Sequence, residues 1–123
     1  MAQQKRDTFG PIALTATLTT NLIAPAAAGA GGVGYTPTAD RITILRLHFV
    51  NKTAAAHTVT LYKGATGANA AGTEVFVALS IAANSTYDYY VPIILEGANG
   101  FLVGGADALT AIVMYADVEI GKV

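Results

Sequence analysis

The sequence predicts an all-β fold: a single-domain antiparallel β-sandwich or jelly roll of about seven or eight strands. Three observations predict it. Apolar residues alternate with a period of two in one segment after another, whereas an amphipathic helix would give a period near 3.6. Turn-forming residues separate these short segments, and no helical span lies between them. The chain has 123 residues, which fits one domain.

The expected strands follow one another at short intervals. In chain order they span residues 12–23, 41–50, 57–64, 74–81, 86–93, 100–105 and 109–120. Alternation also predicts which side chains face the core, because successive residues of a strand point to opposite faces. In the later strands the residues expected on the buried faces are Val59, Leu61, Val75, Val77, Leu79, Ile81, Tyr87, Tyr89, Val91, Ile93, Ile112, Met114, Ala116, Val118 and Ile120.

The strand at 41–50 changes phase in its middle. Its first apolar residues, Ile42 and Ile44, are two apart, and the next three, Leu45, Leu47 and Phe49, are shifted by one position. Such a shift predicts either a β-bulge or a strand that passes from one sheet to the other. A helix is the competing interpretation, but β-branched and aromatic residues dominate and no capping pattern precedes the segment.

Proline and glycine mark the irregular parts of the chain. Pro92 lacks a backbone donor, which places its strand at a sheet edge. Residues 24–40 are rich in alanine, glycine and proline and predict a long extended loop. Residues 1–10 predict a second irregular segment, an N-terminal arm, so that the sandwich domain spans 11–123.

The composition favours a protein whose surface is largely covered by partners. Hydrophobic residues make up 53% of the chain and charged residues only 12%, about half the usual share. The net charge is −1 and no basic face is evident, which argues against nucleic-acid binding. There is no cysteine, no secretory signal and no apolar run long enough for a membrane span. We therefore expect a soluble protein made in a cytoplasm.

One glycine motif invites a functional interpretation. Gly29, Gly31 and Gly34 form a literal G-x-G-x-x-G within AGAGGVGY. A dinucleotide-binding fingerprint requires a helix that opens at the third glycine and an acidic residue about twenty positions later. Pro37 disfavours helix at the residue before it, and no acidic residue occurs between Asp40 and Glu74. The glycines therefore predict a flexible connection, and no cofactor is expected.

No set of residues predicts catalysis or a metal site. His48 and His57 flank the turn at 51–56 and are expected to pair across a hairpin, but a metal would need a third ligand, for which Asp40 or Asp88 would be a guess. A carboxylate pair for acid–base chemistry, Asp117 and Glu119, is more simply a solvated strand face. No motif gives Ser80 or Ser85 a partner base, and the sequons at Asn51 and Asn84 are explained by turns. We expect no enzyme.

The tyrosines are the best candidates for a contact surface. Tyr87, Tyr89 and Tyr90 lie close together, and tyrosine suits both protein interfaces and sugar stacking because a flat apolar ring carries a hydroxyl. Ordinary strand filling remains the alternative. We expect the interface residues to include Tyr35, Tyr87, Tyr89 and Tyr90.

Two stretches together resemble a known family. RITILRLHFVNKTAAAHTVTLYKG is a strand ending in asparagine, a small-residue turn and a second strand. LSIAANSTYDYYVPIILEGANGFLVGGADALTAIVMYADVEIG continues with strands around a Leu-Glu-Gly turn and a closing Val-Glu-Ile strand. Over residues 40–121 this order is similar to the small β-sandwich virion proteins of tailed bacteriophages, above all head decoration (cement) proteins.

The resemblance implies a structural protein of the virion. It implies a homotrimer on the outer capsid surface that bridges and stabilises major capsid protein subunits, with an arm extending onto a neighbour, for which 1–10 and 24–40 are the candidates. A tail-associated or fibre-like module that contacts host glycan through Tyr87, Tyr89 and Tyr90 is the alternative. Neither implies a membrane or nucleic-acid partner.

Overall fold

In the part of the chain that the structure describes, the regular secondary structure is almost entirely β-strand. This computed structural model describes residues 4–25, 33–35, 40–67, 73–90 and 92–122. Within them, strands are interrupted by turns and by one short 3-10 helix, Gly97–Asn99. The expected all-β class is confirmed.

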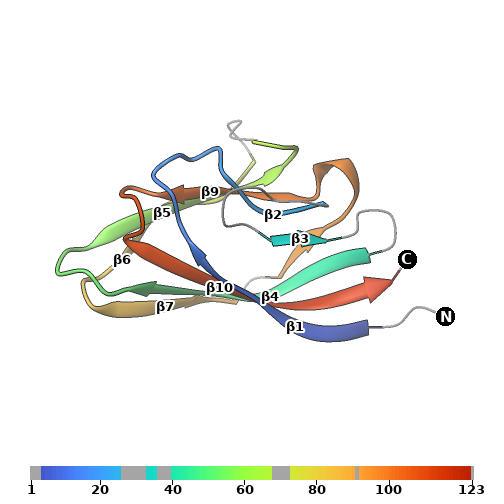
Figure 1. Ribbon diagram of the computed structural model, residues 1–123, viewed down its shortest axis with the longest axis horizontal. Helices are drawn as coiled ribbons and strands as arrows, with labels where there is room; N and C mark the ends of the chain where they lie inside the picture. Colours follow the sequence, from blue (N-terminus) through green and yellow to red (C-terminus); the bar gives the residue numbers. More distant parts are fainter. Residues whose placement is uncertain (1–3, 26–32, 36–39, 68–72, 91, 123) are drawn as a thin grey trace.

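The strands form two five-stranded sheets that lie face to face (Figure 1). The first sheet has the order β1-β10-β4-β7, and β8 also pairs with β4. Its strands are β1 (Gln4–Ala13), β4 (Asp40–Asn51), β7 (Ser85–Tyr89), β8 (Ile93–Leu95) and β10 (Ile112–Lys122). The second sheet has the order β3-β2-β9-β5-β6. Its strands are β2 (Asn21–Pro25), β3 (Val33–Tyr35), β5 (His57–Gly64), β6 (Glu74–Ile81) and β9 (Phe101–Ala106). Within the described ranges all strand pairings are antiparallel except that of β2 with β3.

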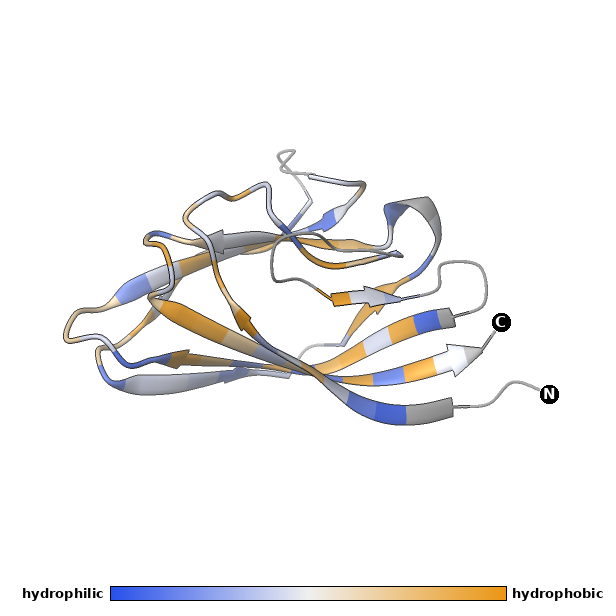
Figure 2. Ribbon diagram, viewed as in Figure 1, coloured by the Kyte–Doolittle hydropathy of each residue, from blue (hydrophilic) through white to orange (hydrophobic). Residues whose placement is uncertain are grey.

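Buried apolar side chains form a hydrophobic core between the two sheets, and Figure 2 shows hydrophobic residues along the strands of both sheets. Every strand of both sheets contributes to it except β7, whose Tyr89 packs against it from the side. Leu47 and Phe49 of β4 and Val59 and Leu61 of β5 are fully buried, as the alternation predicts. Burial of such side chains stabilises the fold by about 1.5–3 kcal/mol each, which makes the core the main source of stability.

The phase change in 41–50 is a β-bulge. Asp117 of β10 lies opposite Arg46, but the next residue, Val118, lies opposite Ile44, so that Leu45 is the extra residue of β4. The bulge keeps the apolar side chains on both sides of it facing the core. The strand stays within the first sheet, which excludes the alternative of a change of sheet.

The N-terminal part of the chain differs from the prediction. Residues 4–10, expected as an irregular arm, belong to β1, and residues 4–9 pair with β10. The single strand expected at 12–23 is two strands, because the chain leaves the first sheet after Ala13 and enters the second at Asn21. Between them the hydroxyls of Thr15 and Thr20 bond to the carbonyl of Thr17, a local pairing that competes with the ladder of a continuous strand.

The segments at 24–40 and 86–93 also differ. Residues 24–25 end β2 and 33–35 form β3, so these parts of the expected loop belong to the second sheet, while 26–32 and 36–39 lie outside the described residues. The strand at 86–93 is divided into β7 and β8, with Pro92 between them. Both halves lie at the edge of the first sheet, where proline is tolerated.

Strand β6 departs from regular alternation. Its register against β5 is interrupted twice, and Ala78 has a left-handed φ of 48°. As a result Val77, expected in the core, is 65% exposed, while Phe76 turns inward. The bulge is stabilised by Thr60, whose hydroxyl accepts a hydrogen bond from the Ala78 amide at 2.9 Å.

Candidate functional site

Most of the large exposed apolar side chains of the described residues lie on, or directly after, the edge strands β6 of the second sheet and β7 and β8 of the first. In the described residues five large apolar side chains are exposed, and four of them lie on these strands or just after β7: Val77 (65%), Tyr87 (40%), Tyr90 (66%) and Ile94 (45%). The fifth, Leu109, lies in the turn before β10. We call these edge strands, with their exposed apolar residues and the groove between β6 and β8, the β6–β8 edge. A cluster of this kind is typical of an interaction surface.

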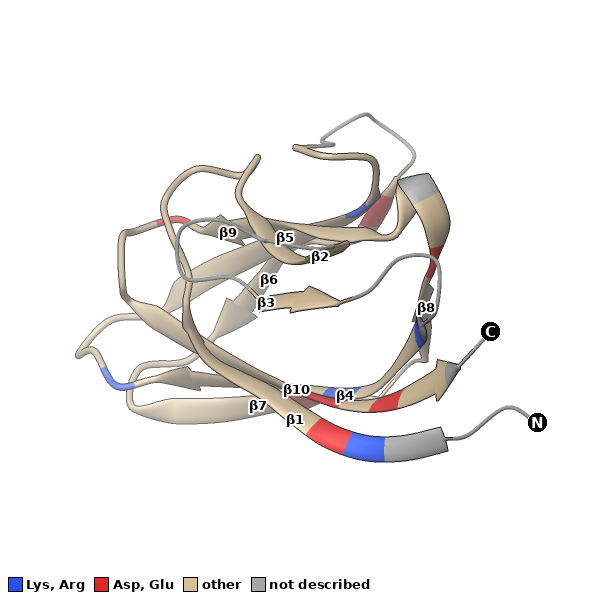
Figure 3. Ribbon diagram, turned by 45° about the vertical axis from the view of Figure 1, so that its right-hand side comes forward, with Lys and Arg blue, Asp and Glu red and all other residues tan. Residues whose placement is uncertain are grey.

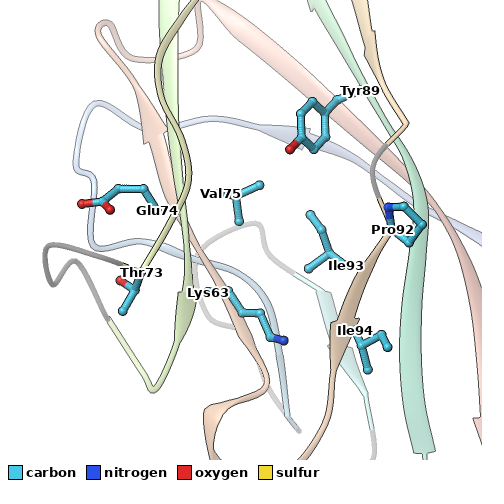
Figure 4. Close-up of a pocket in the computed structure, with 8 residues that line it drawn as sticks. All are labelled: Lys63, Thr73, Glu74, Val75, Tyr89, Pro92, Ile93 and Ile94. Carbon is cyan, nitrogen blue, oxygen red and sulfur yellow. The ribbon is translucent and has the colours of Figure 1, made fainter.

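An open groove of about 670 Å³ runs along this edge (Figure 4). Val75 of β6 and Ile93 of β8 form its two apolar walls, and Tyr89 closes one end. The remaining lining residues are Lys63, Thr73, Glu74, Pro92 and Ile94. The Lys63 ammonium is on the side of Ile94, whereas the Glu74 carboxylate points away from it. The groove therefore offers a largely apolar surface beside one cationic group.

Three aromatic rings support the groove from the core side. Phe49 of β4 contacts Phe76 of β6 edge to face, with ring centres 5.8 Å apart. Phe76 in turn contacts Tyr89 of β7 at 5.1 Å. Because these contacts tie the edge strands of the two sheets to a central strand, the β6–β8 edge is held in a fixed shape.

The predicted tyrosine set does not form one surface. Tyr87 and Tyr89 lie opposite Phe49 and Leu47, so both are on the core-facing side of the first sheet. Tyr90 follows the end of β7 and hydrogen-bonds to Arg46 instead. A single stacking platform made of the three rings is therefore wrong, because neighbouring residues lie on opposite sides of the sheet.

Tyr35 lies in the core. It is only 6% exposed, and its hydroxyl donates a 2.7 Å hydrogen bond to the carbonyl of Gly100. Burial, and then the nearby Glu96 carboxylate, raise the pKa of Tyr35 to about 12, because both disfavour the phenolate. Tyr35 thus holds β3 against the turn before β9, and we leave it out of the candidate contact surface.

The outer face of the first sheet carries a network of charges (Figure 3). At its centre the Arg46 guanidinium bonds to Asp117 at 2.7 Å and lies 3.4 Å from Asp88. Partial burial acts to lower the pKa of Arg46, but Asp117, the hydrogen bond to Tyr90 and Asp88 together raise it above its ordinary value. The Thr8 hydroxyl also donates to Asp117, at 3.0 Å. These partners satisfy one another, as in a structural network.

The two histidines do not pair with each other. They lie in different sheets, because the chain crosses between the sheets at 51–56, so the predicted hairpin pair is wrong. His48 Nδ1 lies 2.6 Å from Asp88 Oδ1, and His57 Nδ1 lies 2.8 Å from Asp107 Oδ1. Among the described residues no three His, Cys, Asp or Glu side chains come together as metal ligands would.

The remaining candidates have local structural partners. Asp117 and Glu119 share a face of β10, and each lies beside an arginine, with Arg6 3.9 Å from Glu119. The Ser85 hydroxyl donates to the carbonyl of Ala83. Ser80 is exposed on β6, as is Asn84 in the turn before β7, whereas Asn51 is fully buried and bonds to the 51–56 crossover.

The glycine motif lies in and before a strand. Gly34 is the middle residue of β3 and pairs with Ala24 of β2. A dinucleotide fold would need a helix to begin here, so the strand excludes that arrangement at Gly34. Gly29 and Gly31 lie outside the described residues.

Sequence reasoning missed the groove, with its lining residues Lys63 and Ile94, and it also missed the exposure of Val77. Alternation placed Val77 in the core, and the only signal against this is that Phe76 and Ala78 make the segment apolar in both phases. Lys63 and Ile94 come from different sheets, so nothing in their spacing indicates that they line one groove.

Comparison with known proteins does not identify a family for this chain. Among the described residues, no helix is both long and apolar enough to cross a membrane. No family model, curated protein or solved structure matches the chain.

Proposed function

We propose that the chain is a structural virion protein of a tailed phage, a decoration or cement protein that binds major capsid protein subunits through the β6–β8 edge. It would act without catalysis, by burying surface between neighbouring subunits on the outside of the capsid. The observation that carries the proposal is the concentration of exposed apolar side chains at this edge. The resemblance of the sequence to head decoration proteins supports the choice of a phage capsid as the partner assembly.

A jelly-roll topology is part of the proposal. In a jelly roll, successive strands cross repeatedly between two sheets and give interleaved strand orders. The orders β1-β10-β4-β7 and β2-β9-β5-β6 support this topology, with β3 and β8 as short additions at the edges. Jelly rolls are common in viral capsid proteins and in lectins, so the fold class by itself favours neither main candidate.

The mechanism would be additive. Covering the exposed part of Val77, Tyr87, Tyr90 and Ile94 removes roughly half of each side chain from water, which is worth about 1 kcal/mol each. A contact of about 4 kcal/mol is weak alone, since association costs at least as much. Many copies on one shell, or a homotrimer that binds through three edges at once, would convert it into stable attachment.

The proposal is tested on particles that carry the protein. Stripping the protein should lower the temperature at which the heads release DNA, and adding it back should restore that temperature. Ile94→Lys and Val77→Lys should fail to rebind, because each places a charge in the apolar contact. Leu109→Lys is the matched control, since Leu109 is at least as exposed as Val77 and Ile94 but lies in the turn before β10, and it should rebind. Unchanged stability of stripped heads would refute cementing.

The oligomeric state has a separate test. Light scattering of the isolated protein should give about three times 12.6 kDa for a homotrimer. A monomer at micromolar concentration would remove the trimer from the proposal and leave the β6–β8 contact in place.

A host-glycan module is the second candidate. It is favoured by Tyr90, which is 66% exposed beside the charged network around Arg46, an arrangement suited to a sugar ring. Specific binding on a glycan array that disappears in Tyr90→Ala and persists in Leu109→Ala would support it. The absence of any array signal would leave the capsid contact as the proposal.

A further inference from the structure

Strand β3 is held to the rest of the fold by few interactions. It has three residues and lies at the edge of the second sheet, and among the described residues it pairs only with β2, in parallel. Parallel pairing is slightly less stable per residue than antiparallel pairing. Val33 is only partly buried and Gly34 is exposed without a side chain. Of the three residues only Tyr35 is buried, so its side chain is the main anchor.

The Tyr35 side chain fits closely against the turn that contains Gly100. The Tyr35 hydroxyl donates to the carbonyl of Gly100, at the turn where the chain passes from β8 to β9. A Cβ atom at Gly100 would collide with that hydroxyl and would lie 2.8 Å from the backbone nitrogen of Glu96. The turn therefore accepts the phenol only because residue 100 is glycine.

The strand beneath β3 does not depend on it. Leu22 and Ile23 of β2 are fully buried in the core, and β2 also pairs with β9 on its other side. Releasing β3 would expose one buried ring and break one side-chain hydrogen bond and a short backbone ladder. This loses far fewer stabilising interactions than unfolding the whole core does. Local opening of such an element requires less free energy than global unfolding.

We propose that β3 is a releasable edge strand: it opens as a unit while the two sheets stay folded, and the Tyr35–Gly100 hydrogen bond is its lock. Opening uncovers the backbone edge of β2, whose central residues Leu22, Ile23 and Ala24 are apolar and buried when β3 is closed. A free strand edge of this kind exposes unpaired backbone amide and carbonyl groups.

Native-state hydrogen exchange in low concentrations of denaturant tests this on the full chain. The β3 amides should exchange through an opening that hardly depends on denaturant, whereas amides of β4 and β9 should show the full dependence of global unfolding. Tyr35→Phe removes only the hydroxyl and should speed β3 exchange about fivefold, the effect of one lost hydrogen bond.

Phe49→Leu is the matched control, since it weakens the core through its contact with Phe76 and does not touch β3. It should speed exchange in β4 and β9 and leave the β3 amides unchanged. If Phe49→Leu accelerates β3 as much as β4, the strand opens only with the whole molecule and the proposal fails. Unchanged exchange of the β3 amides in Tyr35→Phe would show that the Tyr35–Gly100 hydrogen bond does not hold β3 closed.

Discussion

Replacing Asn51, a buried polar residue, should strongly destabilise the protein. Asn51 is fully buried at the end of β4. Its side-chain amide donates to the carbonyls of Ala55 at 2.9 Å, Ile81 at 3.0 Å and Ala82 at 3.2 Å. Its carbonyl accepts from the amide and hydroxyl of Thr53 at 2.9 and 2.8 Å. One side chain thus joins the end of β4 to both the crossover and the end of β6.

The magnitude follows from the groups that Asn51→Ala leaves without a partner. The Ala55 carbonyl keeps a hydrogen bond from the Thr53 hydroxyl. The buried Ile81 carbonyl and the Thr53 amide lose the partners that Asn51 provides, and a buried polar group left unpaired costs about 1–3 kcal/mol. We expect a loss of about 3 kcal/mol in the free energy of unfolding, a large part of the stability of a small domain.

Urea denaturation followed by circular dichroism provides the assay. Asn51→Ala should lower the midpoint without changing the slope, since the same surface is exposed on unfolding. Asn84→Gly is the control: Asn84 belongs to the other sequon, is exposed and has a φ of 52°, which glycine adopts easily. It should stay within about 0.5 kcal/mol of the wild type. A loss below about 1 kcal/mol in Asn51→Ala would refute the reasoning, since even one unpaired buried group should cost that much.

Three further predictions concern Tyr35, Gly100 and the charged network. The pKa of Tyr35 is about 12 in the folded protein and near 10 in the unfolded chain, so its contribution is fully present below pH 10 and is lost as the pH rises through 12. Tyr35→Phe should show a smaller fall in thermal stability between pH 9 and 12 than the wild type, and equal falls would contradict this. Gly100→Ala should cost about 2 kcal/mol or more, because the new methyl group meets the Tyr35 hydroxyl and the Glu96 backbone. Gly97→Ala, where a Cβ meets nothing within 4 Å, should cost only the smaller penalty of its left-handed φ of 69°, and an equal loss in both variants would argue against the clash. Asp117→Asn removes a charge from a partly exposed ion pair with Arg46 and should cost less than about 1 kcal/mol, with a smaller effect in 1 M NaCl. A cost that salt does not reduce would show that packing, and not charge, holds Arg46 in place.

Most of the sheets could be predicted because burial on one face imposes a readable period. The phase change at Leu45 is the clearest case: only a bulge keeps Ile44 and Leu47 both in the core, so the extra residue is visible in the sequence. The N-terminal half of strand β1 shows no alternation of apolar residues. Residues 5–8 are charged or polar at the edge of the sheet, and their place is set by pairing with β10 rather than by their own pattern.

The candidate site was less predictable because it depends on contacts between distant parts of the chain. The alternation correctly separated Tyr90 from Tyr87, but it could not reveal that β6 comes to lie beside β8. The exposure of Val77 depends on a bulge that Thr60 of the neighbouring strand stabilises. His48 and His57 were paired wrongly because a six-residue turn within one sheet and a crossover between two sheets look alike in sequence.

Electron microscopy of the native particle tests the central claim most directly. The account predicts density for this chain on the outer surface of the head, with the β6–β8 edge turned toward the major capsid subunits. Val77 and Ile94 should then be covered, and Leu109 should remain in solvent. Density on the tail, or a chain on the head whose β6–β8 edge faces solvent, would contradict the account.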